Sequence, residues 1–216
     1  MADETERKFL TTGYHLAVVR DDEIFPHYSH RLWLKAVGAG VSSIAQLAQY
    51  YLSLKFDDDG NVVEEDRVRK KVTLDEEGRV AKVKFTRNSK FGFGLTREET
   101  PEVELDPAEF DNLVKNSQFL AFKTGEPPQV HKLRTTAQIG PRTIEIDRYL
   151  GPVLGGLCVT ELEFLSKAEA IDFKPTELPR GILGQELDPT IFGNAQLALK
   201  DEIPAGIILP HYLRPS

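Results

Sequence analysis

The stretch Thr143-Ile-Glu-Ile-Asp-Arg-Tyr149 alternates between polar and apolar side chains at every second position. In an extended strand, side chains at i and i+2 lie on the same face, and their neighbours lie on the other. Glu145 and Asp147 therefore share one face, and Ile146 points the opposite way. This stretch predicts a β-strand with one acidic face and one apolar face.

Charged pairs with the same spacing recur along the chain, and their sign changes from strand to strand. Acidic pairs lie near the start and toward the end of the sequence, and basic pairs lie on the strands between them. Several of these pairs enclose an apolar residue, such as Val68, Val83 or Leu162. The repeated pairs are Glu4 and Glu6 (with Lys8 following), Arg67 and Arg69, Lys82 and Lys84, Glu102 and Glu104, Lys132 and Arg134, and Glu161 and Glu163.

Two folds accommodate strands of this kind. Alternation by itself favours an open antiparallel sheet with one face in water and helices covering the other. A solubilising face, however, usually mixes both signs with Ser, Thr and Gln, whereas these charges are segregated by strand. Eight strands can also close into a barrel that encloses a small ligand. The sequence pattern therefore predicts the α+β class with an antiparallel sheet, and it leaves both the open sheet and the closed barrel possible.

Turn and cap signals place the other elements. The clusters at 56–61 and 75–78 predict two hairpins. Asp106 and Ser166 each precede a helix start with an acidic residue three positions on. Residues 30–51 predict a helix, a loop at Gly38 and Gly40, and then a strand. Further strands are expected over 67–72, 79–87, 102–105, 129–135, 143–149 and 157–165, and the tail from about 175 to 216 predicts short helices and loop.

Composition narrows the class of protein. The chain has 216 residues and a net charge of −7, which favours one domain over residues 1–216 and argues against a general nucleic-acid binder. Cys158 is the only cysteine and is interpreted as a small buried residue. No signal-peptide core and no apolar run of membrane-spanning length occurs. We expect a cytoplasmic protein with no membrane partner, and we do not interpret His27 and His30 as a metal site.

The segregated charges have a clear chemical use inside a barrel. Arginine and lysine bind phosphate oxygens, and arginine can do so through two parallel hydrogen bonds. Clustered carboxylates bind hard divalent cations such as Mg²⁺ or Mn²⁺, which can bridge to the same phosphates. Neither set tolerates enclosure alone, because unpaired buried charges are costly. The pattern therefore indicates a site for a polyphosphate with divalent metal.

Several of these motifs, in their order along the chain, resemble the CYTH superfamily, also called triphosphate tunnel metalloenzymes. The N-terminal Glu4-Thr-Glu-Arg-Lys8 resembles the ExExK signature of that family. Arg97 with Glu99 or Glu102 resembles a later family motif, although Pro101 interrupts the spacing, and the Arg-Tyr pair often found before the asparagine is absent before Asn194. The other matching segments are 46–52, Arg67-Val-Arg69, Lys132-Leu-Arg134, Thr143–Asp147 and Thr160–Ser166.

The resemblance implies the second of these folds, a closed eight-stranded antiparallel β-barrel (a tunnel) with helices packed outside. It also implies metal-dependent hydrolysis of a triphosphate, most like the short bacterial inorganic triphosphatases. It implies Glu4, Glu6 and Lys8 as catalytic residues. Lys84 is preferred on face alternation over Lys82, Arg87 and Lys90 as a further phosphate ligand, and residues 11–40 are interpreted as an insertion. The implied substrate-binding residues are Lys8, Arg67, Arg69, Lys84, Lys132 and Arg134, and the implied Mg²⁺ or Mn²⁺ ligands are Glu4, Glu6, Glu145, Asp147, Glu161 and Glu163.

Other functions remain open at this point. The same tunnel could serve a thiamine triphosphatase or a class IV-type adenylate cyclase. A non-catalytic module that binds polyphosphate or nucleotides would need only the basic strands, and the intact acidic pairs disfavour it. The sequence also leaves open the physiological triphosphate, the preferred metal and assembly as a homodimer.

Overall fold

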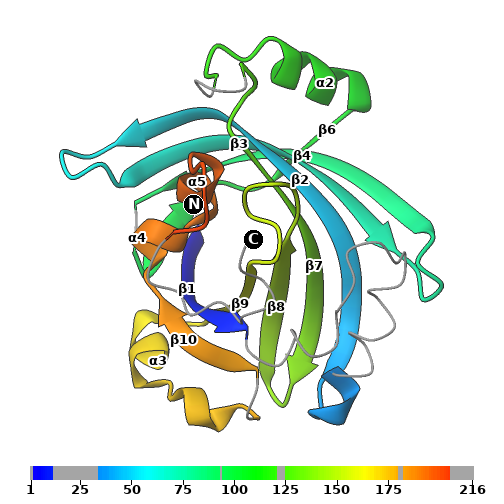
Figure 1. The fold of residues 1–216 in the computed structure, drawn as a ribbon, viewed down its shortest axis with the longest axis vertical. Helices are drawn as coiled ribbons and strands as arrows, with labels where there is room; N and C mark the ends of the chain where they lie inside the picture. The colour runs from blue at the N-terminus through cyan, green and yellow to red at the C-terminus, as the bar shows by residue number, and fades with distance from the viewer. Residues whose placement is uncertain (1, 12–33, 93, 121–124, 180–181, 205–216) are drawn as a thin grey trace.

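The computed structural model describes residues 2–11, 34–92, 94–120, 125–179 and 182–204. Eight antiparallel strands close into a barrel, as predicted (Figure 1). Around the barrel they follow the order β1 (Ala2–Thr11), β5 (Thr96–Glu99), β4 (Val80–Phe91), β3 (Val62–Leu74), β2 (Gly40–Phe56), β7 (Gln129–Ile139), β8 (Arg142–Tyr149) and β9 (Cys158–Phe164), and β9 pairs with β1.

Two further strands extend the sheet without entering the ring. The strand β10 (Leu183–Leu187) pairs with the second half of β1, and β5 pairs with the first half of the same strand. The strand β6 (Val103–Leu105) pairs with the middle of β4. The sequence did not predict β5 or β10, because four or five residues carry too little alternation to be distinguished from loop.

The apolar faces of the strands point outward, where helices cover them. Helix α3 (Lys167–Asp172) packs on β1 and β9, next to a cluster that includes Phe9, Ile146 and Leu162. Helix α2 (Pro107–Lys115) packs on β2, β3 and β4 through Phe110. The main core therefore lies between the barrel and its helices, as the alternation predicted.

At one end, the interior of the barrel is filled by apolar side chains. There Leu10, Val130, Tyr149 and Val159 meet the C-terminal helices α4 (Pro189–Phe192) and α5 (Asn194–Ala198) in a second cluster. A 3-10 turn, η2 (Pro175–Glu177), precedes β10. The tail predicted from residue 175 thus contains short helices, as expected, and the strand β10; residues 205–216 lie outside the described residues.

Local signals in the sequence account for the element boundaries. The side chains of Asp106 and Ser166 accept hydrogen bonds from the backbone N–H groups of Glu109 and Glu169, at 2.8 and 3.1 Å. Both predicted N-caps are therefore confirmed. Both predicted hairpins are present, between β2 and β3 and between β3 and β4, and Gly60 and Gly78 supply the positive φ that the turns require.

The stretch over residues 30–51 follows the predicted order of helix, loop and strand. Residues 34–36 are helical, a turn follows at 37–38, and β2 begins at Gly40. Ile44 and Leu47, which are spaced as on one face of a helix, both lie in β2 beyond that loop. Most of the predicted insertion, with His27 and His30, lies outside the described residues. None of the described helices is long and apolar enough to cross a membrane.

Replacing a core residue on the outer face of the barrel tests the assignment of faces. Ile146 is 0% exposed, whereas Val83, also on the outer face, is 43% exposed. We expect Ile146→Ala to lower the free energy of unfolding by about 2–5 kcal/mol, because it leaves a cavity. Val83→Ala should change it by less than about 1 kcal/mol. Denaturant titration followed by circular dichroism measures both, and equal losses would contradict the assignment.

Candidate active site

The charged faces of the strands line a cavity of about 650 Å³ inside the barrel. The basic residues of the lining come from β3, β4, β5 and β7, and most of the acidic residues come from the three neighbouring strands β1, β8 and β9. Asn194, from α5, reaches the cavity from the closed end. The charged lining residues are five basic ones, Arg67, Arg69, Lys90, Arg97 and Arg134, and eight acidic ones, Asp3, Glu4, Glu6, Glu99, Glu102, Glu145, Glu161 and Glu163.

Strand register places the predicted metal-side carboxylates on one wall. Glu6 on β1 lies directly opposite Glu163 on β9, and Glu145 on β8 lies opposite Glu161 on β9. Glu4 continues the same face of β1 two residues away. Three neighbouring strands therefore form an acidic wall, although their residues are more than 150 positions apart at the extremes.

Arg134 is the central cation next to this wall. Its guanidinium donates two hydrogen bonds to Asp147, at 2.7 and 2.6 Å, and one to Glu161 at 2.7 Å, and it is ion-paired with Glu145. Lys132 is ion-paired with the same Asp147 and donates to Asn194 at 3.2 Å. Burial, together with the nearby Arg134, lowers the pKa of Lys132 to about 8.

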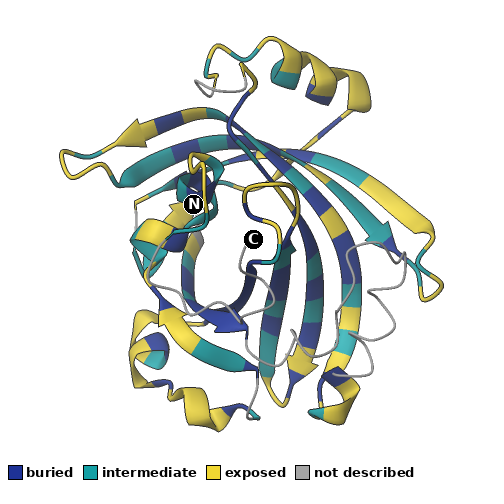
Figure 2. Ribbon diagram, in the orientation of Figure 1, coloured by how far each residue is buried: buried dark blue, intermediate teal, exposed yellow. Residues whose placement is uncertain are grey.

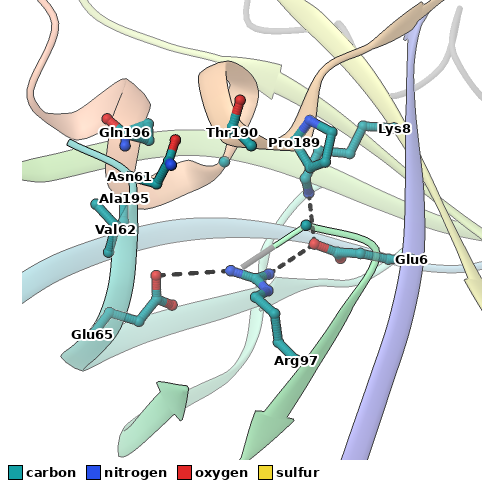
Figure 3. Close-up of a pocket in the computed structure, with 12 residues that line it drawn as sticks. Glu6, Lys8, Asn61, Val62, Glu65, Arg97, Pro189, Thr190, Ala195 and Gln196 are labelled. Atoms are coloured by element: carbon teal, nitrogen blue, oxygen red, sulfur yellow. Dashed lines mark hydrogen bonds and ion pairs between the residues drawn. The ribbon is translucent and has the colours of Figure 1, made fainter. Parts of the chain in front are cut away.

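Arg97 lies where the cavity meets the closed end of the barrel (Figure 3). Its guanidinium is 2.7 Å from Glu6 and 3.9 Å from Glu65, so it joins β1 to β3 across the interior. Lys8 approaches Glu6 from the other side at 3.1 Å. Burial by itself raises the pKa of Glu6, but Lys8 and Arg97 outweigh it and lower that pKa to about 2.

The remaining cations are held in the same way by neighbouring acceptors. Arg67 donates to Glu65, Asn88 and Glu99, at 3.0, 2.9 and 3.0 Å. Lys90 is ion-paired with Glu4. In the cavity wall, each basic side chain is thus paired with at least one carboxylate, which satisfies both partners in this enclosed space.

All twelve residues implied by the sequence lie on the inner face of the barrel, at three depths. Lys8, Lys132 and Asp147 are almost completely buried behind the cavity wall. Lys84 lies at the rim, where its side chain is 33% exposed and 3.5 Å from Glu102. Lys90, six residues further along β4, faces the cavity itself.

Sequence reasoning therefore placed Lys84 on the correct face but did not identify Lys90 as the deeper cation. The alternation of side chains could have identified Lys90 as well, because residues that are an even number of positions apart in a strand, here six, lie on the same face. Glu65 and Asn88 were missed as well, although Glu65 shares a face with Arg67. The signal for Asn88 was absent, since an isolated asparagine in a strand carries no charge pattern.

The donor chemistry of the acidic wall suits hard divalent cations, which prefer carboxylate oxygens. In the described part of the chain, however, no group of three or more His, Cys, Asp or Glu residues is arranged to hold a metal ion. Most of the wall carboxylates are instead engaged by lysine or arginine. Glu163 differs, because it is exposed toward the cavity and no hydrogen bond or ion pair joins it to any described residue. Partial desolvation, together with the nearby Glu145, Glu4 and Glu6, raises its pKa to about 7.

No protein-family model matches the chain, and no curated protein matches it significantly. Among solved structures, the inorganic triphosphatase NE1496 is similar at 24% identity, covering 95% of this chain and 99% of that one, with a TM-score of 0.49. HpAC1 from Hippeastrum, whose structure is described as revealing a dominant triphosphatase activity, is similar at 14% identity over 79% of this chain and 83% of that one, with a TM-score of 0.41. A chain of the Schizosaccharomyces pombe Mediator head module is similar at 11% identity over 77% and 84%, with a TM-score of 0.43.

The raised pKa of Glu163 predicts a pH-dependent stability. A folded state that holds this proton more tightly than the unfolded chain becomes less stable as pH rises from about 4.5 to about 7. In the presence of a chelator, Glu163→Gln should therefore exceed the wild type in free energy of unfolding at about pH 8. We expect a difference on the order of 1 kcal/mol, because solvent at the cavity screens the repulsion.

Chemical denaturation at about pH 8 and about pH 4 measures this effect, and the two proteins should converge at the lower pH because Glu163 is then protonated in both states. Glu98→Gln, on the exposed outer face of β5, is the matched control and should change stability by less than about 0.5 kcal/mol. A wild type that is as stable as Glu163→Gln at the higher pH would rule out the repulsion.

Proposed function

We propose that this protein is a metal-dependent triphosphatase whose substrate is inorganic tripolyphosphate. The observation that carries the proposal is the enclosed cavity in which a basic wall from β3, β4, β5 and β7 faces an acidic wall from β1, β8 and β9. Such an enclosure of both signs suits a ligand that is itself a polyanion with bound cations. The resemblance of the sequence motifs to the CYTH superfamily supports the same reaction.

The balance of charge in the cavity supports a requirement for divalent metal. Eight acidic and five basic side chains line it, so the lining by itself is net negative when all are ionised. A polyphosphate would be repelled from such a site unless cations accompany it. We propose Glu4, Glu6, Glu145, Glu161 and Glu163, with Asp147, as the residues that would hold Mg²⁺ or Mn²⁺. When bound, such an ion neutralises phosphate charge and lowers the pKa of coordinated water.

The basic residues are proposed to bind phosphate oxygens. Arg67, Arg69, Lys90, Arg97 and Arg134 all face the cavity, and arginine matches a phosphate through two parallel hydrogen bonds. Lys8 and Lys132 lie behind the wall, where Lys8 contacts Glu6 and Glu161 and Lys132 contacts Asp147. They would keep these carboxylates ionised and fixed in position. Fixed charges of this kind are the main protein contribution to phosphoryl transfer.

Binding of the anion and of the metal should be coupled through the ion pairs. A phosphate that takes over the guanidinium of Arg134 would free Glu145 and Glu161 from that cation. A metal that takes over these carboxylates would, in turn, free Arg134 for phosphate. Each ligand therefore removes a competitor of the other, which is positive coupling between two sites.

The residues that line the cavity also help to distinguish an inorganic triphosphatase from the alternative functions. The described residues around the cavity include no aromatic side chain that could stack on an adenine or thiamine ring. This favours an inorganic triphosphate over ATP or thiamine triphosphate. An acidic wall gives no advantage to a protein that only binds anions, which disfavours the non-catalytic module. A cytoplasmic location and a homodimer stay predictions.

Phosphate release from tripolyphosphate tests the proposed reaction. We expect turnover with Mg²⁺ or Mn²⁺, loss of turnover with chelator, and little release from ATP or thiamine triphosphate. Glu6→Gln should lower kcat at least about a hundredfold, since it removes a fixed charge in the site. The matched control is Glu64→Gln, whose carboxylate pairs with Lys55 on the outer surface at 2.7 Å and which should keep full activity. Full activity of Glu6→Gln with an intact fold would contradict the role of Glu6.

Calorimetry with a nitrogen-bridged triphosphate analogue that resists hydrolysis tests the coupling. We expect the metal to tighten analogue binding at least about tenfold, after correction for the affinity of metal and analogue in solution. Glu145→Gln removes one competitor of the anion at Arg134, so this variant should bind the analogue more tightly than the wild type without metal. It should also gain less from adding metal. Independent binding of the two ligands, with no change in Glu145→Gln, would contradict ion-pair exchange.

A further inference from the structure

Beyond the cavity, the hairpin of β3 and β4 (Figure 1) extends past β5 and β6, the strands on the far side of β4, while β2 stays paired with β3 as far as Leu74. The two strands stay paired from Glu64–Phe91 to Leu74–Val80. In contrast, β5 pairs with β4 only at Lys90–Phe91, and β6 pairs with it only at Phe85–Arg87. Within the described residues, the segment 80–84 of β4 thus has β3 as its single partner strand. Figure 2 shows this end of the hairpin as largely exposed.

The inner face of this hairpin continues the basic wall of the cavity outward. Lys71 follows Arg69 at two positions on β3, Lys84 lies directly opposite Lys71 on β4, and Lys82 comes next. No bulge interrupts β3 or β4 between Arg69 and Lys82, so side chains at every second position stay on the face that Arg69 presents to the cavity. We call Lys71, Lys82 and Lys84 the lysine track.

Without a bound anion, the lysine track destabilises the folded protein. Like charges directly opposite each other on paired strands are destabilising, and Lys71 and Lys84 form such a pair. Among the described residues, Lys84 is bridged only by Glu102, which is shared with Arg69, and neither Lys71 nor Lys82 has a hydrogen bond or ion pair. An anionic ligand would remove this repulsion.

A second explanation for these lysines is the protection of an exposed edge, since lysine discourages pairing with another chain. The distribution of residues on the two faces argues against it. At the same end of the hairpin, the outer face carries Val83 at 43% exposure and one lysine, Lys70, whereas three lysines lie on the face that continues the cavity wall. Protection of the edge does not require charges on that particular face.

We infer that the lysine track binds the distal part of a linear inorganic polyphosphate whose end is held in the cavity. Lys82 lies opposite Thr73, six residues from Arg67, a distance of about 20 Å along an extended strand. A compact three-phosphate anion held at Arg67 does not reach that far, but a longer chain does. A polyphosphate carries a negative charge on each unit and has no ring, which fits a line of lysines without aromatic side chains between them.

The inference rests on the proposed function for its chemical step. Water attacks the terminal phosphorus, the terminal P–O–P bond breaks, and the products are orthophosphate and a chain one unit shorter. The leaving oxygen stays on the shortened chain, and the proton of the water goes to solvent or to that oxygen. The lysine track takes no part in this step and acts only by binding.

The double variant Lys71→Gln/Lys82→Gln tests the inference against the control Lys70→Gln/Lys115→Gln. The control removes the same number of charges, from the outer face of β3, where Lys70 lies over the ring of Phe85, and from the end of α2. For a long polyphosphate of defined length, the test variant should raise KM roughly tenfold, and its KM should depend less on salt than that of the wild type. KM for tripolyphosphate should stay within about twofold in both variants.

Binding without turnover separates this inference from the proposed function. The affinity for long polyphosphate is measured by calorimetry for both double variants in a Glu6→Gln background. Weaker binding in the test variant alone supports the lysine track even if no phosphate is ever released, in which case only the proposed function fails. Equal affinities for polyphosphate in both variants overturn the inference, and so does a track-dependent affinity for 5′-triphosphorylated RNA without one for polyphosphate.

Discussion

The structure depends on one constraint, which is that charged side chains enclosed in a barrel must be neutralised by their neighbours. Strand alternation sends apolar residues such as Ile146 outward to the helices and leaves the charged ones inside. Unpaired, each enclosed charge would oppose folding. The barrel satisfies this constraint by placing basic strands opposite acidic ones, so that Arg134 alone meets Glu145, Asp147 and Glu161.

The ion pairs that neutralise the enclosed charges also position these side chains for the proposed reaction. Ion pairs across a cavity hold cations and carboxylates in position before any ligand arrives, so little reorganisation is needed when phosphate and metal replace the internal partners. The carboxylate of Glu163, which has no hydrogen bond or ion pair to a described residue, marks the place where the acidic wall is least compensated. Asn194 and Tyr149, joined by a 2.5 Å hydrogen bond, close the opposite end, where apolar residues replace charges.

At the open end of the barrel, the basic face continues, but fewer carboxylates are present to neutralise it. Within the cavity each cation has an acidic partner, but in the lysine track the cations outnumber their partners, and among the described residues only Glu102 reaches one of them. Solvent screening makes this arrangement tolerable, since exposed charges repel each other weakly in water. A gradient from paired charges inside to unpaired cations outside would draw a polyanion toward the cavity.

The sequence by itself determined the strands, their two faces and most of the site, because alternation, hairpin turns and N-caps are local signals and all twelve implied residues share the inner face. Alternation did not close the barrel, which only the resemblance of the ordered motifs implied. The sequence could not determine how deep inside the barrel each of these side chains lies. Lys84 and Lys90 have the same parity on β4, and only the pairing of neighbouring strands puts Lys90 in the cavity and Lys84 at its rim. Nor could it find Glu65, Asn88 or the short strands β5 and β10, since their roles arise from contacts between distant segments. The tertiary structure decided these points, because strand register, which depends on packing around the whole ring, sets which charges meet.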